Sequence, residues 1–524
     1  MSVYGRLFMK KTALFLTTVM LAAMLFSGCS IIPEPVTTTS ESTFNSAVAS
    51  EIEKYLKADG PTYEAMAIDF APKDYGRIIP NITEFIEDMW TKENNSAVYA
   101  FIDLNGEMIC RPLFDYVSYD KNSDAYIVRR TVDGVSKYGF LSSNGAVFTG
   151  LYFDGAAVAQ NTDDDELCFY GSIYEDGKLW VCPIDIDLEI LEPRVVTIDE
   201  GELSVTAKNS QLSVLYMNDE SAVMINRKEF YYSTFLVDIK SGNVLQKFDV
   251  FGSETCKIFG NVIVKQDIRG QGITVYGMNG SVLVEDPKAY SGKVSDDLYM
   301  IANDGELKIY DGDWNKVNSM TISADDIVMT SFGRIAVVEN HDTKVYDKDL
   351  KLINTLDYSI GGGTYLRDWY DFGEGDMFYD SISETNEIIN LNTGAKLQKE
   401  DGFYYEFSNG YILADNESNG NDPVKKFRVY DKEFKEILSG EGTAYIAADE
   451  LTKDLYLIVL NDGVYTVYSM PSLEVRFRLR TDCFSLNPVG GKFYGNDKQH
   501  FVFVDGKGKD ILCYELDYKK VNRV

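Results

Sequence analysis

The stretch Lys344-Val-Tyr-Asp-Lys-Asp-Leu-Lys-Leu-Ile-Asn-Thr-Leu356 is the unit from which this chain is built. It predicts a β-strand that ends at Asp347, a tight polar turn, and a second strand that starts near Leu350. Asp or Asn as the first residue of such a turn caps it through its side chain. A glycine three or four residues later takes the positive φ that the hairpin twist requires.

The same turn recurs along the chain at intervals of 34 to 53 residues. A tyrosine precedes it in five copies, at positions 276, 310, 346, 430 and 468. The first residue of each of the eleven turns is Asp103, Ser142, Asp185, Asp238, Gly277, Asp311, Asp347, Asn390, Asp431, Ser469 or Asp505. The glycine that follows in six copies is Gly106, Gly145, Gly242, Gly280, Gly394 or Gly508. A period near 40 residues with four short strands per unit is typical of a β-propeller blade.

The first two copies share a longer motif. Tyr99-Ala-Phe-Ile-Asp103-Leu-Asn-Gly106 is echoed 39 residues later by Tyr138-Gly-Phe-Leu-Ser142-Ser-Asn-Gly145. Lys137-Tyr-Gly-Phe140 resembles the WG (KWG) repeat family, with tyrosine in the tryptophan position, and the resemblance covers about residues 96–160. The later repeats resemble the broad class of WD40-like and quinoprotein-like propellers, although they lack the Trp-Asp dipeptide of true WD40 repeats.

These patterns predict an all-β fold. We expect a β-propeller of seven or eight four-stranded blades in residues 191–524, with the WG-like β-ribbons of residues 96–190 packed against it as extra sheet. The longest interval, between Asp185 and Asp238, marks the expected seam. Because eleven turns exceed the blades of an ordinary ring, one larger continuous array is the alternative. Apolar residues at helical spacing in Ala47–Leu56 and Ile82–Trp90 predict a short helical lead-in over residues 47–95.

The N-terminus has the pattern of an export signal, and we expect it to act as one. Met9-Lys10-Lys11 precedes a mostly apolar run from Thr12 to Phe26, which is too short to span a membrane as a helix. Leu25-Phe-Ser-Gly-Cys29 resembles a bacterial lipobox, with phenylalanine where the family usually has leucine. The resemblance implies that residues 1–28 are removed and that acyl chains are attached to Cys29. Residues 29–46 are polar and are expected to form a flexible tether. The protein is therefore expected at the extracytoplasmic face of a cell membrane or outer membrane.

The formal net charge of −32 disfavours nucleic acid and anionic lipid headgroups as direct partners. The chain has seven cysteines, with no Cys-x-x-Cys pair, and only two histidines, His341 and His500. We therefore expect no metal site and no cofactor. Six cysteines other than Cys29 are expected to be thiols, several of them buried, and an exported location permits a disulfide without requiring one.

No catalytic signature is evident, so we expect no enzymatic role. The binding candidates are aromatic residues in predicted loops. Tyr365, Trp369, Tyr370 and Phe372 follow the glycine-rich segment Gly361–Gly363, and Trp314 lies in a turn. Such side chains can stack on a sugar ring or fill an apolar patch of a partner, but the favoured interpretation of the cluster at 365–372 is that it covers a joint between blades.

Three functions remain open from the sequence. The first is a lipid-anchored, non-enzymatic propeller that binds a protein or a glycan at the cell envelope. The second is a surface carbohydrate-active enzyme with an acidic pair in the propeller channel. The third is a structural scaffold within an envelope complex.

Overall fold

The computed structural model describes the chain from Met66 to Val521 with gaps. The described residues are 66, 70–88, 95–110, 113–160, 167–175, 177–198, 212–227, 232–250, 254–267, 271–295, 297–303, 305–322, 326–328, 333–357, 369–371, 377–380, 387–416, 425–449, 451–496, 500–515 and 517–521. All of them belong to one compact unit, Phe44–Val524. The predicted signal, Cys29, the tether and the expected helix at Ala47–Leu56 lie outside the described residues.

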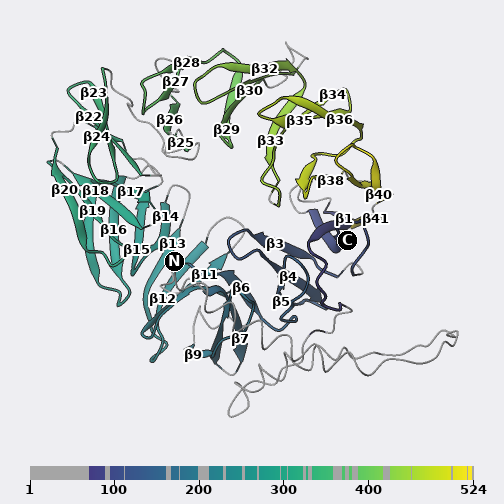
Figure 1. Cartoon of the computed structure of the whole chain (residues 1–524). Helices are drawn as coiled ribbons and strands as arrows, with labels where there is room; N and C mark the ends of the chain where they lie inside the picture. Colours follow the sequence, from purple (N-terminus) through teal and green to yellow (C-terminus); the bar gives the residue numbers. More distant parts are fainter. Residues whose placement is uncertain are drawn as a thin grey trace, which may run out of the picture. The chain divides into compact units, whose positions relative to one another are not determined.

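The described residues form strands and turns without a helix, which confirms the predicted all-β propeller-type fold (Figure 1). Three sheets come mainly from the first 200 residues. The first contains β2 (Asn95–Asp103), β1 (Ile78–Asp88) and β41 (Asp517–Val521). The next two contain β3 (Tyr116–Asp120), β4 (Ala125–Val132) and β5 (Val135–Ser142), and then β6 (Gly155–Val158), β7 (Leu167–Glu175), β8 (Lys178–Asp185) and β9 (Arg194–Thr197).

The sheets that follow repeat one meander of antiparallel strands. They are β10 (Leu212–Met217), β11 (Ser221–Arg227), β12 (Tyr232–Asp238) and β13 (Val244–Val250); then β14 (Glu254–Phe259), β15 (Val262–Asp267), β16 (Gln271–Gly277), β17 (Val282–Ser295), β18 (Leu298–Asn303), β19 (Glu306–Tyr310) and β20 (Lys316–Thr321); then β21 (Asp326–Val328), β22 (Arg334–Glu339), β23 (Asp342–Asp347) and β24 (Leu352–Leu356).

Four further four-stranded sheets complete the series. They are β25 (Trp369–Asp371), β26 (Met377–Asp380), β27 (Glu387–Asn390) and β28 (Lys396–Gln398); β29 (Phe403–Ser408), β30 (Tyr411–Asn416), β31 (Lys426–Tyr430) and β32 (Glu436–Glu441); β33 (Thr443–Ala448), β34 (Leu455–Asn461), β35 (Val464–Met470) and β36 (Glu474–Arg480); and β37 (Asn487–Val489), β38 (Lys492–Asn496), β39 (His500–Val504) and β40 (Asp510–Glu515).

The strand β17 belongs to two units of this series. Its first half pairs with β16, and its second half pairs with β18, so that Tyr290 faces both Gln271 and Ala302. Counted this way, the described strands from β10 to β40 make eight four-stranded units. This number agrees with the predicted seven or eight blades.

Successive sheets are joined by apolar clusters that neither sheet could bury alone. The cluster around Ile309 and Ile335, for example, combines side chains of β18 and β19 with those of β22 and β23. Such a cluster lies at each step of the series, including the step from β6–β9 to β10–β13 at the predicted seam. The packing therefore runs through the predicted seam without a break, and the sheets of β1–β9 continue the series of the eight units.

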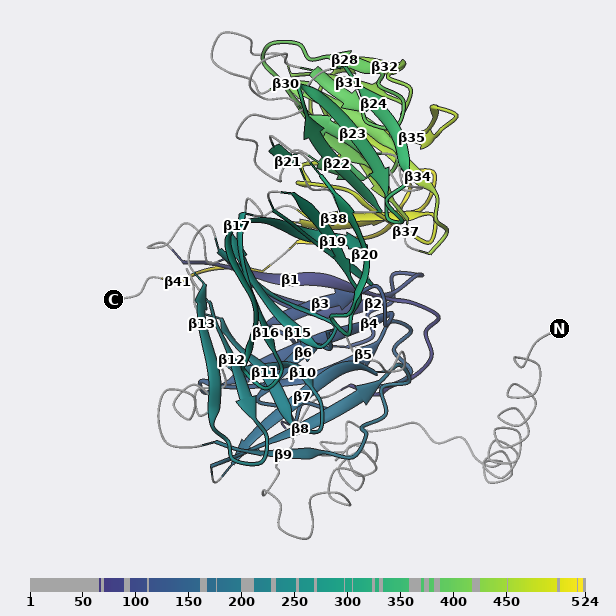
Figure 2. The ribbon, with the colours of Figure 1, turned by 90° about the vertical axis from the view of Figure 1, so that its left-hand side faces the viewer.

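The last sheet of the series packs against the first, so that the series of sheets closes on itself. β41 pairs in parallel with β1 from Glu84↔Asp517 to Asp88↔Val521, and the two strands lie side by side in Figures 1 and 2. Ile79 and Ile102 of the first sheet also pack against Phe501 and Phe503 of β39. The cyclic order of packing is the feature that makes this array a propeller.

The expected helix at Ile82–Trp90 is wrong for its described part. Ile82 to Asp88 continue β1, which pairs with β2 on one side and with β41 on the other. The apolar spacing of this segment suited a helix, but two partner strands satisfy its backbone groups, and one of them lies more than 400 residues away in the sequence. Tertiary pairing of this kind overrides local periodicity.

The predicted turns are present. Asp347 ends β23, and its Oδ1 accepts hydrogen bonds from the backbone N–H groups of Asp349 (2.9 Å) and Lys351 (2.8 Å). The equivalent carboxylates of Asp103, Asp431 and Asp505 cap their turns in the same way. All six predicted glycines have a positive φ, between 74° and 81°.

Five turns without that glycine place a large apolar residue at the same position. Leu188, Trp314, Leu350, Phe434 and Leu473 have φ between 57° and 64°. Each of these side chains packs into the apolar cluster shared with the preceding sheet. Where glycine is present, an added Cβ would meet the preceding sheet, as at Gly508, where Phe477 Cδ2 lies 2.6 Å away. The position is therefore a contact point between neighbouring sheets.

One buried carboxylate ties two sheets together near the C-terminus. Asp449, which follows β33, is 0% exposed. Its Oδ1 accepts hydrogen bonds from the backbone N–H groups of Leu451 (2.9 Å), Thr452 (3.1 Å) and Gly490 (3.0 Å), and its Oδ2 accepts one from Gly491 (2.7 Å). Gly490 and Gly491 form the turn between β37 and β38, so Asp449 links neighbouring sheets.

Candidate functional site

Trp314 lies in the predicted turn, but its side chain is partly buried and is not available as an exposed binding residue. Its ring stacks on Tyr310 with 4.6 Å between ring centroids and an interplanar angle of 12°. It also contacts Phe259 of the preceding unit and Tyr299 of its own unit. Its positive φ of 62° turns the side chain into this joint. The alternative interpretation, that such aromatics cover joints between blades, therefore holds for Trp314.

The other predicted aromatic residues are only partly described. Trp369 and Tyr370 lie in the short strand β25, and not in a loop, and their backbone pairs in register with Tyr379 and Phe378 of β26. Tyr365 and Phe372 lie outside the described residues. The structure therefore does not bring these four candidates together into a described site.

A pocket of about 670 Å³ lies between the β6–β9 sheet and the β10–β13 sheet. Its lining from the first sheet is Leu167, Tyr170, Pro183, Leu191, Glu192, Pro193 and Arg194, and its lining from the second is Tyr216, Met217, Asn218 and Asp219. The volume is within the range typical of ligand-binding sites. Two adjacent sheets therefore contribute one wall each.

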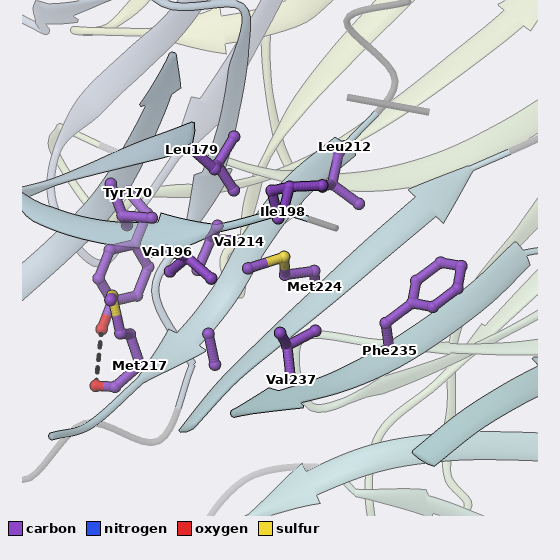
Figure 3. Close-up of a cluster of buried hydrophobic side chains, with 12 residues drawn as sticks. Tyr170, Leu179, Val196, Ile198, Leu212, Val214, Met217, Met224, Phe235 and Val237 are labelled. Atoms are coloured by element: carbon purple, nitrogen blue, oxygen red, sulfur yellow. Dashed lines mark hydrogen bonds between the residues drawn. The ribbon is translucent and has the colours of Figure 1, made fainter. Parts of the chain in front are cut away.

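The floor of the pocket is fixed by the core of this joint. Tyr170 on β7 is 2% exposed, and its hydroxyl donates a hydrogen bond of 3.5 Å to the backbone oxygen of Met217 on β10 (Figure 3). Val196, Leu212 and Val214 pack in the same cluster. Because these side chains come from both sheets, the floor is held rigid by packing from both sides.

The wall from the first sheet comes from the turn that follows β8 and from the start of β9. Leu191 lies between β8 and β9, six residues after Asp185. Its backbone N–H donates a hydrogen bond of 2.9 Å to the backbone oxygen of Pro183. Pro183 and Pro193 line the pocket on either side of this turn. Proline fixes φ, so these walls lose little conformational freedom when a ligand binds.

The rim of the pocket carries charge. Arg194 Nη1 lies 3.2 Å from Asp219 Oδ1, and this ion pair bridges the two sheets at an exposed position. Asn218 caps the neighbouring turn, because its Oδ1 accepts hydrogen bonds from the backbone N–H groups of Glu220 (2.9 Å) and Ser221 (2.8 Å). Glu192 is exposed and makes no ion pair within the described part of the chain. The rim therefore combines one neutralised pair with one additional carboxylate.

The chemistry of this site suits binding. Apolar and tyrosine side chains form its floor, and polar groups surround its mouth, which is the usual composition of a ligand pocket. Among the described residues, no group of three or more His, Cys, Asp or Glu is placed to hold a metal ion. The structure also contains no helix, in its described ranges, that is long and apolar enough to cross a membrane.

The cysteines beyond Cys29 are thiols, as predicted, and Cys110, Cys182 and Cys483 are buried. Burial raises the pKa of the Cys182 thiol to about 12. This thiol therefore stays protonated at neutral pH and is a poor nucleophile. Cys182 packs in the core between the β3–β5 and β6–β9 sheets.

The pocket was not predicted from the sequence. One signal was available, because proline is scarce, with 12 in the chain, and two prolines lie within ten residues of Asp185 and both line the pocket. The longest interval between turns also falls here. Neither signal identifies Met217 to Asp219 as the opposite wall, because that wall belongs to the next unit.

No protein-family model and no curated protein matches this sequence. Solved structures that align with the chain include one titled "Dihydro-heme d1 dehydrogenase NirN in complex with DHE", at 11% identity and a TM-score of 0.26 over 72% of this chain and 75% of that one. The crystal structure of a eukaryotic initiation factor aligns at 10% identity and a TM-score of 0.27 over 84% and 96%. The WD40 domain of Toxoplasma gondii coronin aligns at 10% identity and a TM-score of 0.19 over 49% and 66%. TM-scores this low carry no argument about function, and the fold assigned above rests on the chain's own sheets.

Proposed function

We propose that this chain is a lipid-anchored, extracytoplasmic propeller that binds a protein or glycan partner at the cell envelope and has no catalytic role. The observation that carries the proposal is the pocket between the β6–β9 and β10–β13 sheets, with its rigid floor and its polar rim. A preformed concave site in a stable scaffold favours binding, because little ordering is needed when the ligand enters.

The anchor and the repeats complete the proposal. Leu25 to Cys29 support acylation at Cys29, and two or three acyl chains would hold the protein durably at a membrane, since each buried methylene contributes about 0.8 kcal/mol. The motif Lys137-Tyr-Gly-Phe140 supports a WG-like origin for the sheets around β2 and β5. The tether would then let the propeller body stand away from the bilayer.

Anchoring is tested by growing a bacterium that expresses the chain with a labelled fatty acid. We expect the label on the wild-type protein and none on Cys29→Ser, which should leave the membrane fraction. A wild-type protein that carries no label, or a Cys29→Ser variant that stays in the membrane fraction, would contradict the proposed anchor.

Binding through the pocket is tested by capture from an envelope extract with Leu191→Trp, whose larger ring occupies the pocket. The matched control is Ile353→Trp, because Ile353 lies at the same repeat position six residues after Asp347 and is 39% exposed. We expect a partner retained by the wild type and by Ile353→Trp to be lost by Leu191→Trp. Equal retention by all three proteins would show that this pocket is not the binding site.

A further inference from the structure

The apolar part of the pocket is suited to aliphatic side chains. The partly exposed side chains of Leu167 and Leu191 contribute flexible apolar surface, and those of Pro183 and Pro193 contribute rigid apolar surface. The tyrosine rings are not available as stacking platforms, because Tyr170 is 2% exposed and Tyr216 is 6% exposed. A sugar ring normally needs an open aromatic face, so this floor favours an aliphatic group over a saccharide.

The charged part of the pocket is suited to a cation. Arg194 is neutralised by Asp219 across the rim, which leaves the Glu192 carboxylate as the surplus charge. The chain as a whole has a formal net charge of −32, and such a field attracts cationic ligands and repels anionic ones. The Glu192 carboxylate and the negative net charge of the chain therefore both favour a positively charged ligand.

We infer that the pocket between β6–β9 and β10–β13 binds a basic, partly apolar peptide segment of a partner protein. An aliphatic side chain of the segment packs against Leu191 and Pro183, and a lysine or arginine beside it meets Glu192 at the rim. This inference rests on the proposed binding function and specifies its ligand class. A pocket of about 670 Å³ has room for a short peptide segment.

The probes are three fluorescent pentapeptides with the same leucine and proline content and with lysine, glutamine or glutamate at the remaining positions. Fluorescence anisotropy with the purified chain should give the tightest binding for the lysine peptide and none for the glutamate peptide. Raising the salt from about 0.02 M to about 0.3 M should weaken the lysine peptide most, because the Debye length shortens. A lysine peptide that binds no more tightly than the glutamine peptide overturns the inference.

Variants locate the contact. Glu192→Gln should weaken the lysine peptide about threefold and leave the glutamine peptide unchanged, as expected for an exposed charge pair. Leu191→Ala should weaken both about fivefold, through lost apolar contact. The matched control is Glu433→Gln, an exposed turn carboxylate in another sheet, which should change neither. Thermal unfolding by circular dichroism confirms that each variant is folded, and a Glu192→Gln variant with unchanged affinity contradicts the inference.

The outcomes separate this inference from the proposed function. If Leu191→Trp abolishes envelope capture but no peptide binds, the ligand class is wrong and the binding function stands. A neutral oligosaccharide, maltoheptaose, serves as the competing probe. If it binds and Leu191→Trp abolishes its binding, the peptide assignment is likewise overturned. If Leu191→Trp changes neither capture nor peptide binding, both proposals fail at this pocket.

Discussion

At the scale of single residues, Asp449 shows how a buried charge can be stabilising. Its carboxylate is 0% exposed, and four backbone N–H groups donate to it. Burial alone would raise its pKa, but these donors, with Gly491 first, outweigh that effect and lower the pKa. The charge is therefore held in place by the main chain of two sheets, and it forms no ion pair with a lysine or arginine among the described residues.

We predict that Asp449→Ala lowers the free energy of unfolding by about 3 kcal/mol, because it leaves buried N–H groups without an acceptor. Asp431→Ala is the matched control. It removes a carboxylate that caps a turn within one sheet, and it should cost about 1 kcal/mol. Urea unfolding followed by tryptophan fluorescence measures both. Equal losses would show that the link between sheets adds nothing.

The lowered pKa of Asp449 also predicts a pH dependence. A carboxyl group whose pKa is lower in the folded protein contributes stability above its unfolded pKa of about 3.9, and that stability is lost as the pH falls through the folded pKa. The stability difference between the wild type and Asp449→Asn should therefore be constant from about pH 7 to pH 5 and should narrow below about pH 4. Urea midpoints across this range test the expectation, and a difference that does not narrow in acid contradicts it.

Trp314 marks a limit of sequence reasoning at this scale. A tryptophan in a polar turn indicates an exposed residue when only its neighbours in the sequence are considered. Its partial burial follows from the positive φ, from Tyr299 of its own unit and from Phe259 of the preceding unit, which no local pattern contains. Leu350 and Phe434 occupy the same repeat position as Trp314. A comparison of the three residues would have indicated an apolar side chain that packs against the preceding sheet.

At the scale of elements, the turn between the last two strands of each unit has two roles. It reverses the chain, and the residue with positive φ contacts the preceding sheet. Glycine fits where that sheet approaches closely, as at Gly508, and a large apolar residue fits where a space must be filled, as at Leu350. The sequence predicted the first role from Asp347 and the glycines, but not the second, because the neighbouring sheet lies about 40 residues away.

The second role predicts an unusual order of stability. Leu350→Ala loses the apolar contact and keeps the strain of φ 62°, whereas Leu350→Gly loses the contact and removes the strain. We expect Leu350→Gly to be more stable than Leu350→Ala by about 1 kcal/mol, although glycine usually destabilises. Chemical denaturation of the two variants measures this order. An alanine variant at least as stable as the glycine variant would contradict it.

Gly508→Ala is the complementary change. Its Cβ would lie 2.6 Å from Phe477 Cδ2 at a φ of 77°, so we expect a loss of about 2 kcal/mol. Gly410→Ala serves as the control, because it has a similar φ of 83° but nothing within 4 Å of the added Cβ. Its loss should be about 1 kcal/mol, from strain alone. If both variants lose the same amount in denaturant titrations, contact with the preceding sheet does not matter.

At the scale of the whole molecule, the chain is closed by its last described strand. The repeats predicted the series of sheets, but the partner of β1 could not be predicted, because no turn or motif connects residues 84–88 to residues 517–521. The pocket has the same origin, since its two walls belong to neighbouring units and meet only when the sheets pack.

Removing β41 should weaken the contact between the first sheet and the β37–β40 sheet, because β1 loses one of its two partner strands. We expect a chain that ends at Glu515 to lose protection from hydrogen exchange in β1 and β2 and in the β37–β40 sheet, and to unfold several degrees lower in temperature. The β18–β24 region should keep its protection, because its neighbours are intact, and it serves as the internal control. Exchange rates in β1 that do not change after truncation would contradict a closing role for β41.

The strand β17 has a mechanical consequence. Other neighbouring units meet through side chains and through isolated hydrogen bonds, such as the one of 2.8 Å from the backbone N–H of Gln160 to the oxygen of Leu215. The two units that share β17 are also connected by one continuous backbone with hydrogen bonds along both halves. A pulling force would have to break the hydrogen bonds of β17 with β16 or with β18 before these two units could separate. We therefore expect the two units to unfold together under force, whereas other neighbouring units separate one at a time.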